Sequence, residues 1–222
     1  LYYSYKEANI LSIGQRIVNM KDIIEPTDAI YQTLVQEWIQ CAFETTGECL
    51  RSNEDLCQLS YEDRSIICHT AADQMIIMAS QFTSSQVNVF GVPGYSNIVA
   101  TVYGKHTVAL HLQTLKHVDS DLVMVKLGIA IFALSEITHL YSANAPMHLT
   151  NPIEIFQIQN KYAVLTWKYL LYKYGHDRAV KRYFSLISWF NSGIYYMHHV
   201  QAVTPYVGQF DLLVAALVLT II

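Results

Sequence analysis

Charged side chains are scarce in this sequence. Asp, Glu, Lys and Arg make up 14% of the 222 residues, whereas apolar residues make up 52%. A chain with so few charges is expected to bury a large core, to enclose an apolar cavity, or both. The formal net charge is −4, so no positive field favours nucleic acid or an acidic membrane, and we expect no DNA contacts within this chain. The length suits one domain over residues 1–222.

Paired cysteines and long hydrophobic runs are lacking as well. The four cysteines (Cys41, Cys49, Cys57 and Cys68) form no CxxC pair, which excludes a zinc finger and predicts free thiols in a reducing compartment. The first residues lack the basic end and apolar run of a signal peptide. The most apolar stretch, residues 212–222, is well short of the roughly 20 residues that span a bilayer. No membrane association is expected.

Motifs of common enzymes are also missing. The sequence contains no HExxH, no glycine-rich phosphate loop and no GxSxG. Nine histidines are present, but the adjacent His198 and His199 diverge on a helix, and so do His106 and His111. We therefore predict no enzyme, no catalytic residue, no metal site and no haem or flavin. An all-helical enzyme with an apolar substrate is the alternative, and it requires converging acid groups that the sequence does not offer.

Glycine and proline number only 9 and 5, and their scarcity favours long helices. Ser60 with Asp63 is a capping-box pattern, Asn151 and Pro152 open another helix, and Gly175 ends it. A polar loop is expected over residues 45–55, and residues 86–103 predict a short β-hairpin. Helices are predicted over residues 5–20, 27–44, 60–82, 105–117, 119–139, 152–174 and 177–202.

The helix at 60–82 is apolar on every side, so it should be a central helix with others around it. His69, Asp73 and Gln74 interrupt its apolar run. A buried polar group needs a partner, and Asp73 is expected to form an internal salt bridge or, alternatively, to contact a ligand.

Three groups of residues follow one another in order. The first group consists of Trp38-Ile39-Gln40, Leu59-Ser60-Tyr61-Glu62-Asp63-Arg64, Ile66-Ile67 and His69. The second group is Met124-Val125-Lys126, which leads to Ile131. The third group consists of Ile158-Gln159-Asn160-Lys161-Tyr162, Leu170, Tyr174, Arg182-Tyr183 and Leu186. Their order and spacing over residues 28–200 resemble the ligand-binding domain of nuclear receptors. The resemblance implies an all-α fold, a three-layer antiparallel sandwich of about 10–12 helices with a small β-hairpin.

The resemblance also implies a ligand-regulated transcription factor. A small apolar ligand, such as a steroid or lipid, would favour docking of the C-terminal helix and so create a surface for coregulator proteins. The ligand residues implied are Tyr31, Leu34, Val35, Met75, Ile76, Ala79, Phe90 and His198. The coregulator groove implied is Ile39, Gln40, Ile66 and His69.

The sequence departs from this family at the groove. Gln40 and His69 stand where the family has lysines, and residues 203–222 contain no Glu to close the clamp. The chain also lacks the eight cysteines of the family's zinc-containing DNA-binding domain, so zinc and DNA contacts are expected only in a domain outside this chain. Nuclear localisation is implied by the resemblance, with the cytoplasm as the alternative.

A second hypothesis assigns the chain a different role. The many Tyr and Phe side chains (16 and 8) could fill the pocket themselves and leave a ligand-free interaction module. Phe184, Ile187, Phe190 and Ile194 recur at nearly a 3.5-residue period, which suits a dimer interface with a second copy or another nuclear receptor. Packing within the core explains the same stripe equally well.

Overall fold

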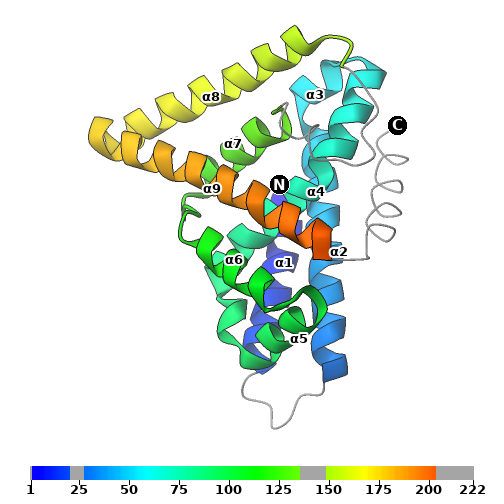
Figure 1. Ribbon diagram of the computed structural model, residues 1–222. Helices are drawn as coiled ribbons and strands as arrows, with labels where there is room; N and C mark the ends of the chain where they lie inside the picture. The colour runs from blue at the N-terminus through cyan, green and yellow to red at the C-terminus, as the bar shows by residue number, and fades with distance from the viewer. Residues whose placement is uncertain (1, 21–27, 136–148, 204–222) are drawn as a thin grey trace.

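The computed structural model describes residues 2–20, 28–135 and 149–203; within these ranges, the side chains of residues 2–10, 39, 43, 45–51, 69, 70, 72–74 and 201 are not described. Every element in the described part is helical (Figure 1), which confirms the all-α prediction. The elements are α1 (Tyr2–Asn19), α2 (Asp28–Ser52), α3 (Glu54–Gln58), α4 (Tyr61–Val87), η2 (Val89–Gly91), α5 (Pro93–Tyr103), α6 (Lys105–Leu115), α7 (Leu122–Ala133), α8 (Pro152–Tyr174) and α9 (His176–Val203).

Capping residues set the predicted helix ends. The Ser60 hydroxyl accepts the backbone N–H of Asp63 at 3.1 Å, and the Asn151 side chain accepts that of Glu154 at 3.2 Å. Gly175 ends α8 with a φ of 73°, a backbone conformation that suits glycine. These local predictions are confirmed, because each depends on a few neighbouring residues only.

The predicted hairpin over residues 86–103 is wrong. Instead, α4 ends at Asn88 in the left-handed conformation, η2 makes one turn, and Pro93 starts α5 at a position where its missing N–H is harmless. The β-branched Ile98 and Val99 lie buried on one face of α5, so tertiary burial outweighs their preference for strands. A Cβ at Gly94 would clash with the ring of Tyr31, which explains the glycine inside this helix.

The predicted loop over residues 45–55 is also wrong. Helix α2 continues through it to Ser52, and Asn53 then caps α3 by accepting the backbone N–H of Leu56 at 3.1 Å. The polar composition of this segment suits an exposed helix as well as a loop, so composition alone does not separate the two.

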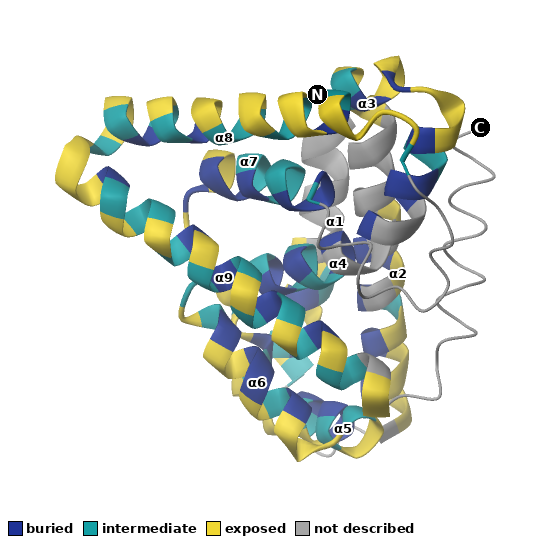
Figure 2. Cartoon of the chain, turned by 45° about the horizontal axis from the view of Figure 1, so that its top comes forward, coloured by how far each residue is buried: buried dark blue, intermediate teal, exposed yellow. Residues whose placement is uncertain are grey.

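Helix α4 occupies the centre of the described helices. It contacts α1, α2, α6, α7 and α9, and its buried residues belong to two clusters. Met75 and Ile76 pack with α1, α2 and α5, whereas Met78 packs with α7, α8 and α9. The prediction of a central helix is thus confirmed. Figure 2 shows that α8 carries its buried residues on the side that faces the other helices and its exposed residues on the outer side.

Helices α8 and α9 form a helical hairpin whose two helices meet at one end of the molecule and spread apart from there (Figure 1). No described helix carries an apolar stretch long enough to cross a lipid bilayer. The atypical C-terminal segment, residues 203–222, lies almost wholly outside the described residues, and the side chain of Asp73 lies outside them too.

Candidate functional site

A cavity of about 100 Å³ lies beside the middle of α4. Its walls come from the consecutive elements α4, η2, α5 and α6 and from α2 and α9, which lie before and well after them in the sequence. The described lining residues are Val35, Trp38, Ile76, Ile77, Ser80, Phe90, Tyr95, Val99, Tyr103, His111, Tyr196 and Val200. None of these carries a full charge at neutral pH, so the cavity is suited to a neutral guest.

His111 is the most polar group in this wall. The residue is only 4% exposed, and neither ring nitrogen has a hydrogen-bond partner among the described residues. Its ring lies 4.3 Å from that of Phe90 and 5.4 Å from that of Tyr196, measured between centroids. Burial lowers the pKa of His111 to about 3, so its imidazole is neutral at physiological pH.

Tyrosines and one hydrogen-bonded pair complete the wall. Burial raises the pKa of both Tyr95 and Tyr196, so both keep their phenol protons. The Trp38 indole, also in the wall, donates to the Ser80 hydroxyl at 2.8 Å, which joins α2 to α4. The cavity is therefore an aromatic chamber with a few neutral polar groups, the composition typical of small-molecule sites.

The ligand residues implied by the resemblance divide into two groups. Val35, Ile76 and Phe90 line the cavity. Tyr31, Leu34 and Met75 are buried in the adjacent core cluster, while Ala79 is half-buried and His198 is exposed. Leu34 also borders a hollow of about 360 Å³ between α1 and α2, whose described lining residues are mostly exposed and include no buried polar group to recognise a ligand.

The groove residues are only partly described. Ile66 is buried, and Gln40 is exposed, where its side-chain amide donates to Glu44 at 3.0 Å. The side chains of Ile39 and His69 lie outside the described set. Gln40 thus makes a local contact within α2, the arrangement of an ordinary solvent-exposed helix face.

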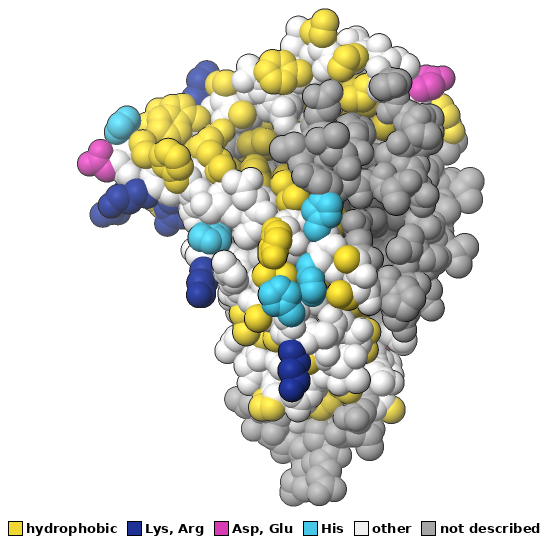
Figure 3. Space-filling model, viewed as in Figure 1, with side chains coloured by type: hydrophobic (Ala, Val, Ile, Leu, Met, Phe, Trp, Pro, Cys, Tyr) yellow, Lys and Arg dark blue, Asp and Glu magenta, His cyan; other side chains and the backbone are white. Residues whose placement is uncertain are grey.

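The four residues predicted to form a dimer interface, which lie on α9, differ in exposure. Phe184 is 66% exposed and Ile187 is 40% exposed, whereas Phe190 and Ile194 are half-buried against the cluster around Trp189. Figure 3 shows hydrophobic side chains on the surface around the turn where α8 and α9 meet. Only the first half of the predicted stripe is therefore open to a partner.

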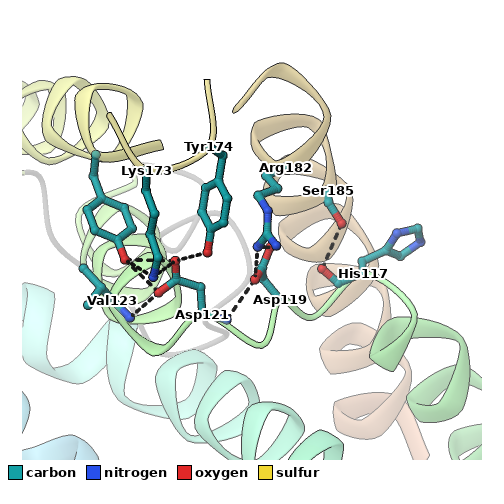
Figure 4. Close-up of polar contacts among 9 residues, drawn as sticks. His117, Asp119, Asp121, Val123, Lys173, Tyr174, Arg182 and Ser185 are labelled. Carbon is teal, nitrogen blue, oxygen red and sulfur yellow. Dashed lines mark hydrogen bonds and ion pairs between the residues drawn. The ribbon is translucent and has the colours of Figure 1, made fainter. Parts of the chain in front are cut away.

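The same end of the molecule holds a polar network (Figure 4). Asp121 caps α7 by accepting the backbone N–H of Val123 at 3.1 Å, and it also accepts from Tyr169, Lys173 and Tyr174 of α8. Burial raises the pKa of Asp121, but the hydrogen bonds from Tyr174, Lys173 and Tyr169 and the Lys173 charge outweigh it and lower this pKa to about 2.

Neighbouring contacts extend this network to α9. Asp119 binds the Arg182 guanidinium at 2.5 Å, and the Ser185 hydroxyl donates to the His117 carbonyl at 3.1 Å. Together these bonds attach the α6–α7 connection to the α8–α9 hairpin. Since every group in this network is engaged, its role is structural.

Histidines gather on the face shown in Figure 3, and one pair is in contact. The rings of His106 in α6 and His199 in α9 are 4.7 Å apart at right angles. Among the described residues, no group of three or more His, Cys, Asp or Glu side chains is placed to hold a metal ion.

Sequence reasoning missed most of the cavity wall. Tyr95, Val99 and Tyr103 were hidden by the incorrect hairpin. Trp38 belonged to a family motif but was not predicted to line the pocket, and Ser80 and Tyr196 carried no motif. His111 had one usable signal, because it shares a helix face with the apolar Val108 and Leu115. A histidine on an apolar face indicates a buried polar group that needs a partner.

No protein-family model, curated protein or solved structure matches this chain.

Proposed function

We propose that this chain is the ligand-binding and regulatory domain of a nuclear receptor-type transcription factor. The observation that supports this best is the cavity beside α4, which is neutral, apolar and lined from α2, α4, η2, α5, α6 and α9 together. A ligand there would touch most of the helices around α4, so binding would shift the population of their arrangements. Coregulator proteins would respond to that shift.

The proposal includes a three-layer arrangement of the helices. The contacts of α4 with α1, α2, α6, α7 and α9 support a middle layer that contains α4. The sequence resemblance over residues 28–200 supplies the functional part of the proposal. The exposed Gln40, which replaces a family lysine, favours a coregulator grip that depends less on charge.

Native mass spectrometry tests for a resident ligand. We expect the folded chain to carry a mass excess that disappears on denaturation, and Ile76→Trp to abolish it by filling the cavity. Ile153→Trp, on the exposed face of α8, is the matched control and should keep the excess. A bare mass in the wild-type protein, or an excess that survives Ile76→Trp, would contradict a ligand in this cavity.

A ligand-free dimerisation module is the second candidate. At about 100 Å³ the cavity is smaller than the roughly 300–1,000 Å³ of typical ligand sites, which favours it. In that case Phe184 and Ile187 would contact a second copy. Replacing both with Glu should give a monomer in analytical ultracentrifugation, whereas Lys105→Glu, at an exposed position at the start of α6, should leave a dimer intact. A dimer that persists in the double variant would exclude this interface.

A further inference from the structure

His111 is buried at the wall of the cavity and has no hydrogen-bond partner among the described residues. Buried polar groups in folded proteins are nearly always hydrogen-bonded, and an exception calls for an explanation such as a ligand or bound water. Both nitrogens of His111 lack partners among the described residues, and the ring also lines the cavity. The missing partner can therefore be supplied from inside the cavity.

The protonation state of His111 defines what that partner must offer. A neutral imidazole has one N–H that donates and one nitrogen that accepts. A hydroxyl group matches either nitrogen, since it both accepts and donates. A carboxylate matches only the donor, and no Lys or Arg among the described lining residues would compensate its charge.

The size and walls of the cavity limit the rest of the ligand. An engineered cavity of about 150 Å³ in another protein holds benzene, so a cavity of about 100 Å³ admits one ring at most. Phe90 and Tyr196 contact the ring of His111, and Tyr95 packs edge-on against Phe90, so the wall offers ring faces and edges to an aromatic guest.

We infer that the cavity selects a small neutral molecule of about one ring whose hydroxyl group hydrogen-bonds to His111. This inference depends on the proposed function, because it specifies the ligand class of the same cavity. It names a much smaller ligand than a steroid or lipid, and it makes His111 the residue that distinguishes hydroxylated from purely apolar guests.

Phenol and toluene are a matched pair of probes, because they have the same ring and differ in replacing a hydroxyl by a methyl group. Each is titrated into the folded chain and followed by protein NMR. We expect phenol to bind the wild-type chain about tenfold more tightly than it binds His111→Leu, while the affinity of toluene changes less than twofold. His111→Gln retains a donor and an acceptor and should recover part of the phenol preference.

The comparison of two probes within each variant separates recognition from a general loosening of the fold. If phenol and toluene bind the wild-type chain but His111→Leu affects both equally, the hydroxyl assignment is overturned and the cavity remains a ligand site. If neither probe binds the wild-type chain, or if Ile76→Trp binds both as well as wild type does, this cavity is not the ligand site and both proposals fail. Saturable binding of phenol that depends on His111 supports them together.

Discussion

Asp121 and His111 lie ten residues apart, and both are buried, with 8% and 4% of their surface exposed. Asp121 is surrounded by a backbone N–H, two tyrosine hydroxyls and a lysine. His111 has ring faces around it and no hydrogen-bond partner among the described residues. The hydrogen bonds of Asp121 join α7 to α8, whereas the two ring nitrogens of His111 remain able to form hydrogen bonds. Buried polarity alone therefore does not indicate a binding site, and an unpartnered polar group beside a cavity is the more informative feature.

The largest effect is expected from Asp121→Ala. The substitution removes the acceptor shared by Tyr169, Lys173 and Tyr174 and also uncaps α7. Breaking such a hydrogen-bonded carboxylate should lower the free energy of unfolding by about 3 kcal/mol, measured by urea denaturation. Asp177→Ala is the control, because that side chain is 97% exposed and should leave stability unchanged. Equal stability of the two variants would mean that the network does not hold the helices together.

The pH dependence of stability sharpens the contrast. His111 has a pKa of about 3 in the folded chain and 6.5 in the unfolded chain, so the unfolded chain takes up the proton first. The stability of the folded state therefore decreases as the pH falls from 6.5 toward 3. At pH 5, which is 1.5 units below the pKa of His111 in the unfolded chain, the free energy of unfolding is lower by about 2 kcal/mol than at neutral pH.

Urea denaturation at pH 7.5 and pH 5 should show this loss of stability in the wild-type chain. The loss should be smaller in His111→Leu, which has no imidazole to protonate. The contribution of Asp121 belongs to a lower window. Its pKa of about 2 in the folded chain lies below the ordinary value of 3.8, so its stabilisation is present above pH 3.8 and is lost as the pH falls toward 2. Identical acid sensitivity of wild type and His111→Leu above pH 5 would show that His111 is not held neutral by burial.

The same contrast explains which features the sequence could predict. Ser60, Asn151 and Gly175 act on backbone groups within four residues, so their helix ends were predictable. The central position of α4 followed from apolar residues on all its faces. The β-branched segment in α5 was misread, because its helical state depends on burial against distant residues such as Tyr31.

The cavity is harder to predict, because its lining residues come from several helices that meet only in the folded chain. Val35, Ile76 and Phe90 were identified through the family resemblance, but His111 and Tyr196 come together only when α6 packs against α9. No spacing within either helix reveals that contact. Likewise, the helix predicted over residues 119–139 puts Asp121 near its start, but the partners of Asp121 on α8 lie about fifty residues further along the chain.

The smallest effect tests whether the Asp121 network is redundant. Tyr174→Phe removes one hydrogen bond to Asp121, at 2.7 Å, and keeps the ring over which the Arg182 guanidinium lies at 3.9 Å. Tyr169 and Lys173 still donate to the same carboxylate, so we expect a loss of only about 1 kcal/mol in urea denaturation. Tyr172→Phe is the matched control on the same helix, since Tyr172 is 93% exposed and should show no change. A loss as large as that of Asp121→Ala would mean that the network acts as a single cooperative unit, and that one missing partner is enough to leave the carboxylate as poorly satisfied as His111.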